Sequence, residues 1–330
     1  NGILTRTIIS LVMVLGALWF LGPREPASLQ IDYGRISVSD DVDTYLSDAE
    51  ARFDDIVPGT EKRVSWFSTP GEKTPISIVY IHGFSASSEE LRPVPDLVAE
   101  ELGANLYFTR LTGHGRGSAA MADSSVASWM QDVGEALTIG RAIGDRVLII
   151  STSTGATLAA AAALDKVSME NVDGIIFVSP NFGINKRAAS LLTWPFARQW
   201  LPLILGANRS YEPRNALHAR YWTTTYPTTA LLPMAALVEA VMGEDFSGVS
   251  IPALFYYSMD DLVVDPAETA AFADQWGSAV TFVHPQLGNG DDEYAHVIAG
   301  DIVSPQQTGF AVQEMLRWLS AQPGWPVSGR

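Results

Sequence analysis

The sequence predicts an α/β fold in which a mostly parallel central sheet is covered by helices on both faces. Short apolar, β-branched runs alternate along the chain with segments of helical spacing, and the runs are almost continuously apolar. Runs of that kind are typical of parallel strands buried on both sides. The runs expected as strands are residues 63–67, 76–81, 105–108, 147–150, 173–179, 251–257 and 279–283.

Helices are expected between these strands, where apolar residues recur three and four positions apart. The first, residues 41–53, places Val42, Tyr45 and Leu46 on one side and acidic residues elsewhere. The other predicted helices of the sheet domain are residues 89–102, 126–143, 156–164, 266–276 and 306–319. We therefore assign residues 41–330 to one catalytic domain, preceded by a linker at 23–40 that is rich in Pro and Ser.

Composition excludes several classes of protein. The chain has 330 residues, a formal net charge of −16 and no cysteine. The negative charge argues against a nucleic-acid partner, because a phosphate backbone would be repelled. The absence of cysteine excludes disulfides, cysteine zinc sites and a cysteine nucleophile. It leaves the redox compartment undetermined, and nothing in the composition indicates an oligomeric state.

The N-terminal segment, residues 1–22, is expected to be a signal anchor that spans a membrane. Arg6 precedes a run from Ile8 to Leu21 interrupted only by Ser10 and Gly16, and the whole segment approaches the ~20 residues that cross a bilayer. A cleaved signal peptide is less favoured, since Glu25-Pro26-Ala27 is a poor cleavage site. A buried helix is the third interpretation.

The orientation follows from the charge beside the segment. With Arg6 held inside, the catalytic domain lies outside the cytoplasm, on the periplasmic side if the source is bacterial. If the segment is cleaved, the protein is secreted. The chain begins with Asn1 rather than Met, so its start could lie further upstream.

Residues 183–248 interrupt the alternation of strands and helices and are expected to form a cap over the sheet. They contain two helix-like stretches, residues 188–201 and 229–242, and many aromatic residues. These aromatics either form an apolar substrate-binding wall or are simply the small core of the cap. The candidate substrate-binding residues are Trp194, Trp200 and Trp222 in the cap and His82 outside it.

Ser153 is the candidate nucleophile. It follows the apolar run 147–150 and precedes the alanine-rich run 156–164, so it falls on a strand-to-helix connection. A nucleophile elbow needs small residues two positions before and after the serine, here Ser151 and Gly155. Ser151 itself fails that test, because Ile149 stands two positions before it. The alternative is an ordinary helix N-cap serine.

The motifs together resemble those of the α/β-hydrolases, in particular serine esterases similar to monoacylglycerol lipases. The resemblance covers roughly residues 60–320 and implies an α/β-hydrolase fold with a helical cap. It includes an acid after a late strand and a final histidine, in the chain order nucleophile, acid, histidine. The remaining motifs are His82-Gly83-Phe84, Gly113-His114-Gly115 and Ser151-x-Ser153-x-Gly155.

The resemblance implies a histidine base on the loop after the last strand. Of the five histidines, only His284 and His296 follow the candidate acids, and the family's placement favours His296 over His284, which ends a strand. For the acid, the family pattern Asp-x-Val-Val fits Asp261, with Asp260 as the alternative. Asp265, before a proline, is expected to be a helix N-cap.

The resemblance also implies an oxyanion hole made by the backbone N–H groups of Phe84 and Thr154. His82 and His114 are expected to hydrogen-bond loop backbone near the site. The Gly290–Glu293 loop lacks the spacing of a calcium site, and no histidine pair has zinc spacing, so neither metal nor cofactor is expected.

The implied activity is hydrolysis of an apolar, lipid-like ester through an acyl-enzyme. Three residues carry it: Ser153 attacks, His296 transfers the proton and Asp261 orients His296. Thioester, amide or carbon–carbon hydrolysis on the same three residues stays open, as does a non-catalytic, hydrolase-like binding protein. Epoxide hydrolysis is disfavoured by the serine.

Overall fold

The computed structural model describes residues 2–325; Asn1 and residues 326–330, which the predicted domain boundaries include, lie outside the described residues. Within that range one sheet has seven strands in the order β1-β3-β2-β4-β5-β8-β9. All neighbours are parallel except β1 and β3, so the predicted fold class is confirmed. The strands are β1 (Arg63–Ser65), β2 (Thr74–Ile81), β3 (Asn105–Phe108), β4 (Gly144–Thr152), β5 (Val172–Val178), β8 (Ala253–Tyr256) and β9 (Val280–Val283).

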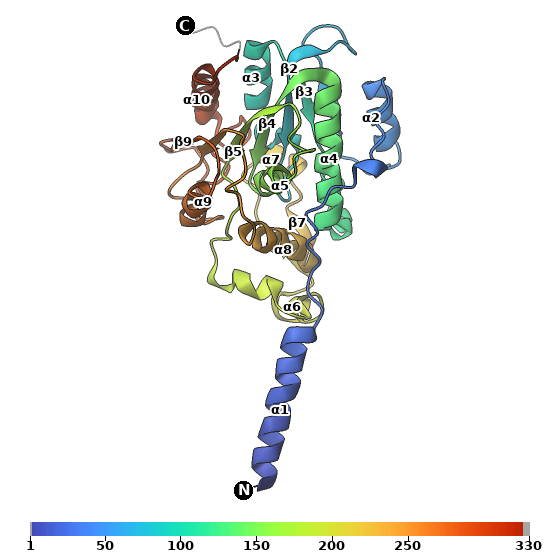
Figure 1. Cartoon of the computed structure of the whole chain (residues 1–330), viewed down its shortest axis with the longest axis vertical. Coiled ribbons are helices and arrows are strands. Elements are labelled where there is room, and N and C mark those ends of the chain that lie inside the picture. Colours follow the sequence, from blue (N-terminus) through green and yellow to red (C-terminus); the bar gives the residue numbers. More distant parts are fainter. Residues whose placement is uncertain (1, 326–330) are drawn as a thin grey trace.

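Helices cover both faces of this sheet (Figure 1). One apolar cluster joins the sheet to α3 (Val94–Leu102) and α10 (Thr308–Ser320). The other cluster joins the opposite face to α2 (Val42–Glu50), α4 (Val126–Ile143), α5 (Thr154–Ala163) and α9 (Pro266–Ala273). Strand side chains alternate between the two clusters, as in β4, where Ile149 faces one and Ile150 the other. Two 3₁₀ turns, η3 (Ala119–Asp123) and η6 (Pro305–Gln307), precede α4 and α10.

The predicted helix at 89–102 is wrong in its first turn. Residues there form a separate 3₁₀ turn, η2 (Ser88–Glu90), and α3 begins only at Val94. Two local causes explain the break. Ser87 caps η2 by accepting a hydrogen bond from the Glu89 N–H, and Arg92 precedes Pro93, which disfavours helical backbone at Arg92.

The insertion between β5 and β8 is mainly helical and lies at one end of the sheet (Figure 1). We call residues 183–248 the cap. The predicted helix at 188–201 is broken in the structure, since Trp194 precedes Pro195 and Phe196 has a left-handed φ of 58°. The elements are η4 (Arg187–Thr193), α6 (Ala197–Leu205), β6 (Asn208–Ser210), α7 (Ala216–Tyr221), β7 (Thr225–Pro227), η5 (Thr228–Ala230) and α8 (Leu231–Met242).

Helix α1 (Gly2–Leu21) projects from the cap end of the molecule (Figure 1). Residues 4–21 are long and apolar enough to cross a membrane, with a mean hydropathy of 1.9, and none of them is buried. The segment after α1 runs along the body. It includes η1 (Tyr33–Arg35), and Ile31 and Ile36 pack so closely on Gly134 of α4 that a Cβ there would clash.

Candidate active site

Ser153 lies on the turn between β4 and α5, with φ 51° and ψ −117°. A serine in this region of backbone space is strained, and such strain is typical of functional turns. The neighbours make the turn possible. Gly155 has no room for a Cβ, which would clash with the Ile81 carbonyl, and the Ser151 hydroxyl is occupied by the Ile176 carbonyl at 3.1 Å. Ser153 is therefore the hydroxyl that the turn presents.

A hydrogen-bonded chain joins Ser153, His296 and Asp261. The His296 Nε2 is 3.0 Å from the Ser153 Oγ, and its Nδ1 is 2.8 Å from the Asp261 Oδ2. A neutral imidazole with a carboxylate at Nδ1 carries its proton there, which leaves Nε2 to accept the serine proton. All three side chains are buried, with Asp261 only 2 % exposed. Ser153 lies 108 positions before Asp261 and 143 before His296, and the three side chains thus form one proton-transfer line.

Backbone groups hold the acid and the base in place. The Asp261 Oδ1 accepts the N–H groups of Val263 and Val264 at 2.8 and 2.9 Å. The Asp292 Oδ2 accepts the His296 N–H at 3.1 Å, and the Ser179 hydroxyl donates to the His296 carbonyl at 2.6 Å. The acidic loop before His296 therefore positions the imidazole.

Burial and charge act in opposite directions on His296. Burial alone would lower its pKa, but the Asp261 carboxylate raises it, with smaller contributions from Glu90 and Asp292, so the pKa is raised overall. The raised pKa makes the imidazole a stronger base for the serine proton.

The alternative acid and base lie elsewhere. Asp260 is exposed, and its N–H donates to the Ser258 hydroxyl. His284 has its Nδ1 3.0 Å from the Tyr257 carbonyl and its ring against Phe282. Asp261 and His296, rather than Asp260 and His284, thus face Ser153. Asp265 caps α9 by accepting the Ala267 N–H, as expected.

The His82-Gly83-Phe84 loop lies against the serine. A Cβ at Gly83 would come within 3.0 Å of the Ser153 Cβ. In the described part of the chain neither the Phe84 N–H nor the Thr154 N–H has a protein acceptor. The Thr154 hydroxyl is also buried without a partner. These donors are available to an oxygen atom bound beside Ser153.

His82 and His114 hydrogen-bond loop backbone, as the sequence suggested. The His82 Nε2 accepts the Leu111 N–H at 3.1 Å, and its Nδ1 lies 2.8 Å from the Gly83 carbonyl. Burial holds the pKa of His82 well below its usual value and lowers that of His114 to about 4. Both rings are neutral, and main-chain groups occupy both ring nitrogens of His82, whose role in substrate binding stays a prediction.

The cap tryptophans do not form one wall beside Ser153. Trp194 contacts Trp19 of α1 with ring centroids 5.1 Å apart, and Trp200 contacts Trp194 at 6.4 Å. Trp222 packs in a separate cluster with Ala86. Trp194 and Trp200 therefore lie at the junction of the cap with α1, and Trp222 packs beside the loop that follows Phe84; their role in substrate binding stays a prediction.

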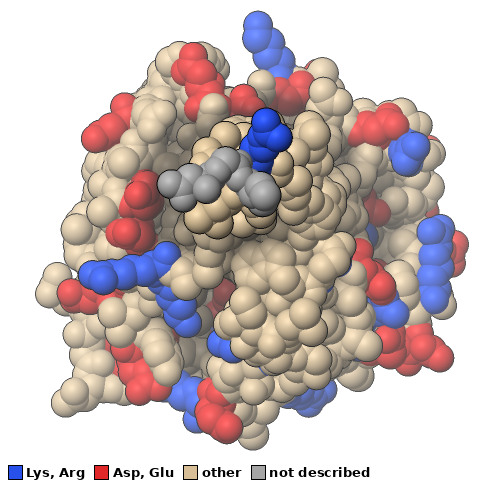
Figure 2. Space-filling model, turned by 90° about the horizontal axis from the view of Figure 1, so that it is seen from below, with Lys and Arg blue, Asp and Glu red and all other residues tan. Residues whose placement is uncertain are grey.

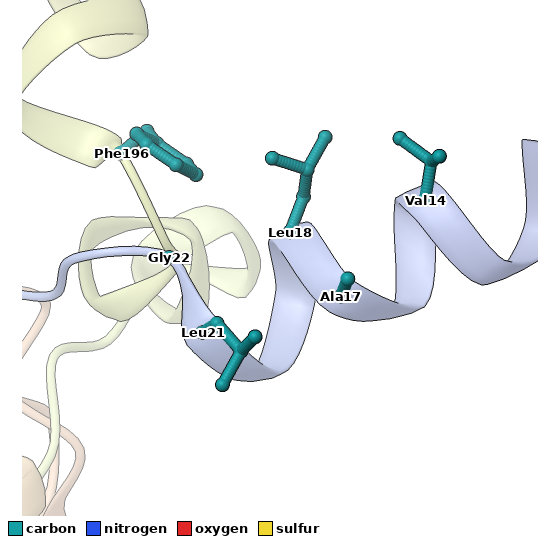
Figure 3. Close-up of a pocket in the computed structure, with 6 residues that line it drawn as sticks. All are labelled: Val14, Ala17, Leu18, Leu21, Gly22 and Phe196. Carbon is teal, nitrogen blue, oxygen red and sulfur yellow. The ribbon is translucent and has the colours of Figure 1, made fainter.

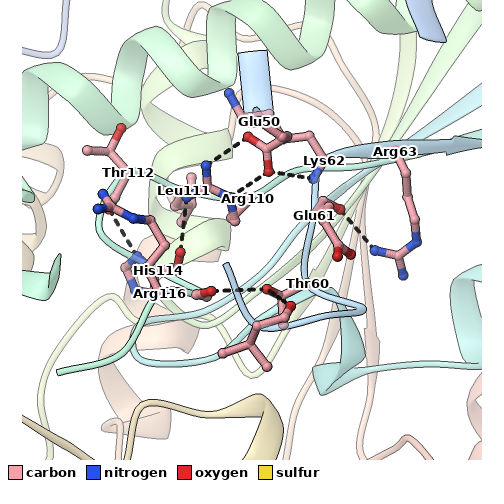
Figure 4. A network of polar contacts seen from close by, with 12 residues as sticks. Glu50, Thr60, Glu61, Lys62, Arg63, Arg110, Leu111, Thr112, His114 and Arg116 are labelled. Carbon is pink, nitrogen blue, oxygen red and sulfur yellow. Dashed lines mark hydrogen bonds and ion pairs between the residues drawn. The ribbon is translucent and has the colours of Figure 1, made fainter. Parts of the chain in front are cut away.

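A polar network behind this loop connects it to α2 (Figure 4). Glu50 and Arg110 form a bidentate ion pair in which both N–O distances are 2.7 Å. Both side chains are buried. Arg110 also donates to the His114 carbonyl at 3.1 Å. The His114 Nε2 in turn accepts the Ser85 N–H at 3.0 Å. The network fixes the loop that presents the Phe84 N–H.

Glu90 is a buried carboxylate beside the site that the sequence prediction missed. Its Oε2 accepts the Gly83 N–H at 2.7 Å, and its side chain is 3 % exposed. Burial raises the pKa of Glu90 to about 7, against the opposing effects of the Gly83 bond and His296. The available signal was the spacing Ser87-x-x-Glu90, a capping pattern three residues before Pro93, which indicates a break between Glu90 and the helix that follows.

Comparison with known proteins agrees with this architecture. The structure of LipS and LipT, two metagenome-derived lipolytic enzymes, is similar with a TM-score of 0.63 and 20% identity, covering 81% of this chain and 100% of that chain. The soluble variant of Saccharomyces cerevisiae monoglyceride lipase has a TM-score of 0.57 and 12% identity, covering 78% and 90%. Paleococcus ferrophilus monoacylglycerol lipase has 0.54 and 14%, covering 78% and 98%. At these identities the likeness shows the fold.

No curated protein sequence matches the chain significantly. The sheet order, the elbow after β4 and the cap before β8 define a hydrolase of the α/β type. A model of the alpha/beta hydrolase family matches residues 78–301, more than half of the chain, so the chain belongs to that family.

Proposed function

We propose that this protein is a carboxylic ester hydrolase that acts through an acyl-enzyme. The observation that carries the proposal is the hydrogen-bonded chain from Asp261 through His296 to the strained Ser153. A serine hydroxyl becomes nucleophilic only when a neutral imidazole takes its proton, and the imidazole needs a carboxylate that fixes its tautomer.

The reaction then has two halves. Ser153 Oγ attacks the ester carbonyl while His296 Nε2 takes the hydroxyl proton, and the imidazolium gives that proton to the leaving alcohol. A water molecule, deprotonated by His296, next attacks the acyl-enzyme and releases the carboxylic acid. Asp261 stays ionised and stabilises the imidazolium in both halves.

The oxyanion of each tetrahedral intermediate would be bound by the Phe84 and Thr154 N–H groups. A missing donor of this kind typically costs ~2.7 to 4 kcal/mol of barrier height. Because both donors are main-chain groups, side-chain replacement at either residue alters the geometry rather than deleting the donor.

Membrane anchoring is the second part of the proposal. Helix α1 is exposed along its whole apolar length, as a helix solvated by lipid would be, and its composition meets the requirement for a span. With Arg6 on the cytoplasmic side, the hydrolase body would lie outside the cytoplasm. An anchored enzyme with an aromatic cap fits an apolar, lipid-like ester better than a water-soluble one.

The direct test is labelling of the purified protein by a fluorophosphonate, which reacts only with an activated serine. We expect labelling and hydrolysis of short-chain nitrophenyl esters in the wild type, and loss of both in Ser153→Ala with an unchanged circular dichroism spectrum. Ser151→Ala is the matched control and should retain both. Labelling that persists in Ser153→Ala would contradict the proposal.

The remaining alternatives use the same three residues. Thioester, amide and carbon–carbon hydrolysis would all give an acyl-enzyme or its equivalent, so a panel of such substrates at equal concentration ranks them. A non-catalytic binding protein would show no labelling at all.

A further inference from the structure

The cap has an apolar ridge at the end of α6 that has no partner in the described part of the chain. Leu203 is 86 % exposed, Ile204 71 % and Leu205 40 %, although they are consecutive large apolar residues. A soluble surface rarely exposes such a run, and a contiguous apolar patch usually marks an interaction site. We call Leu203–Leu205 the ridge.

Indole rings lie where α1 leaves the cap. Trp19 of α1 contacts Trp194 of the cap, and Trp200 contacts Trp194 in turn. The Arg24 guanidinium lies 5.2 Å from the centre of the Trp19 ring. Tryptophan is enriched at the boundary between acyl chains and headgroups, where its apolar ring and polar N–H are both satisfied.

The junction between α1 and the cap is held by directed contacts. The Phe196 N–H donates to the Pro23 carbonyl at 2.8 Å, and Arg24 donates to the Thr193 carbonyl at 2.6 Å. Arg198 and Glu25 form an ion pair at 2.6 Å. The cap segment that carries the ridge therefore begins at the membrane end of α1.

An apolar hollow of about 250 Å³ lies at this junction rather than at Ser153 (Figure 3). Phe196 of the cap and Leu18 of α1 lie on two sides of it, and no charged residue lines it. Its lining residues are Val14, Ala17, Leu18, Leu21, Gly22 and Phe196. The hollow is open to the surroundings and continues the apolar surface of α1 onto the cap.

The charge of this part of the cap differs in sign from that of the whole chain. Residues 186–210 contain four basic residues and no acidic residue, in a chain with a net charge of −16. Within residues 2–325, Lys186, Arg187 and Arg209 have no carboxylate partner. Seen from the side of α1, basic and acidic residues both lie round the rim of a mostly uncharged centre (Figure 2). It is the local basic excess of residues 186–210 that complements a bilayer with anionic headgroups.

We propose that the cap face formed by the ridge, Trp194 and the basic residues of 186–210 docks on the surface of an anionic bilayer. The proposal rests on the membrane anchoring of α1 proposed above. The ridge enters the interface beside α1, and Lys186, Arg187 and Arg209 contact lipid phosphates. Figure 1 places α6 and α8 between α1 and the main sheet, so the cap is the part of the hydrolase that meets an ester dissolved in the leaflet.

The experiment uses the absence of cysteine from the chain. Single cysteines are introduced in the full-length protein by Ile204→Cys in the ridge, Leu11→Cys in the middle of α1, and Val167→Cys, an apolar residue of the body that is 53 % exposed. Each is labelled with an environment-sensitive fluorophore. The proteins are reconstituted into vesicles of phosphatidylcholine with or without phosphatidylglycerol, containing lipid nitroxides at headgroup depth or at the bilayer centre.

For Ile204→Cys we expect a blue shift and stronger quenching by the headgroup nitroxide than by the central one. Leu11→Cys should show the reverse order of quenching, and Val167→Cys should show none. If the Leu11 label is quenched but the Ile204 label is not, the ridge proposal is overturned while anchoring stands. If the Leu11 label is not quenched, anchoring itself fails. Neither readout depends on ester hydrolysis.

The charge requirement is tested in the same vesicles. Quenching of the Ile204 label should be stronger with phosphatidylglycerol and should lose that dependence in Lys186→Gln/Arg187→Gln. Equal quenching in neutral and anionic vesicles would remove the anionic-lipid part of the proposal. A blue shift that grows with protein density at fixed lipid, without nitroxide quenching, would identify a second copy of the chain as the occupant and overturn it.

Discussion

The floor of the candidate site and the face of the cap differ in how their side chains are held. At the floor, Asp261 and His296 are buried, and each is fixed by backbone or side-chain hydrogen bonds between 2.6 and 3.1 Å long. On the cap face, Leu203 and Ile204 are mostly exposed, and in residues 2–325 Lys186 and Arg187 have no carboxylate partner. The floor is determined by packing within the chain. The cap face has no such internal constraint.

This difference predicts where substitutions act. Changes at the floor should alter chemistry or folding on any substrate, because every group there is the partner of another. Changes on the cap face should leave folding and the hydrolysis of water-soluble esters intact and act only when a bilayer is present. The following experiments test this difference.

The largest effect is expected for Asp261→Asn. The amide cannot hold the His296 tautomer with Nε2 free, so kcat should fall on the order of 10⁴-fold with little change in KM. Steady-state kinetics with a nitrophenyl ester measures this. Asp260→Asn, a change of the exposed neighbouring residue, is the matched control and should retain wild-type turnover. Equal losses in the two variants would contradict the role of Asp261 as the carboxylate that orients His296.

Next in size is the effect of Glu50→Ala on stability. It leaves the Arg110 guanidinium buried without its carboxylate partner, and removal of one member of a buried ion pair typically costs ~3–5 kcal/mol of unfolding free energy. Urea denaturation followed by fluorescence measures the loss. Arg35→Gln removes one member of the exposed Asp32–Arg35 pair and should not change the midpoint detectably. A similar midpoint for both variants would contradict a supporting role for the Figure 4 network.

Glu90→Gln should change the pH dependence of catalysis more than its maximum. The glutamine oxygen can still accept the Gly83 N–H, but the negative charge that helps raise the pKa of His296 is gone. Because activity requires neutral His296, the acid limb of the kcat/KM profile should move to lower pH. A pH-rate profile over the range in which the protein stays folded measures it.

Glu90→Ala separates charge from position. It removes the acceptor for the Gly83 N–H as well as the charge, so kcat should also fall through a misplaced oxyanion loop. An acid limb that stays unmoved in both variants would show that Glu90 acts only as a packing residue.

The smallest effect in solution is expected for Leu203→Ser. The side chain has no internal packing to lose, so unfolding free energy should change by less than ~0.5 kcal/mol. Turnover of a soluble nitrophenyl ester should be unchanged, while turnover of a long-chain ester embedded in vesicles should fall. Val167→Ser, on the body, should change neither. A loss of soluble-ester turnover in Leu203→Ser would mean that the ridge affects catalysis even without a bilayer. That result would contradict the proposed difference between the cap face and the floor.

The same division explains what could be predicted from the sequence. Ser153 was found because the elbow needs small neighbours at fixed spacing, and Gly155 has space for nothing larger. Asp261 and His296 needed the family pattern, since spacing alone left Asp260 and His284 open. The parallel sheet could be predicted because almost continuously apolar runs are typical of strands buried on both faces.

Other features depended on contacts between distant segments and could not be predicted. Glu90 falls within the predicted helix at 89–102, whereas in the structure it ends the separate turn η2 and its side chain is buried. Trp194 and Trp200 were assigned to a substrate wall because aromatic density alone does not say which surface a ring contacts. Trp194 contacts Trp19 of α1, 175 positions earlier in the chain, and Trp200 contacts Trp194.

The linker between α1 and the body, residues 23–40, restricts how far the body can move away from α1. If residues 23–40 were a free, extended tether, their 18 positions could reach up to ~60 Å. Instead Pro23 and Arg24 are fastened to the cap, Ile31 lies on Gly134, and the Tyr33 hydroxyl bonds to Ser168 at 2.8 Å. If α1 is anchored as proposed, these contacts would hold the hydrolase body close to the membrane. The substrates it could reach would then be lipids in the leaflet next to the cap, and lateral diffusion would supply new ones.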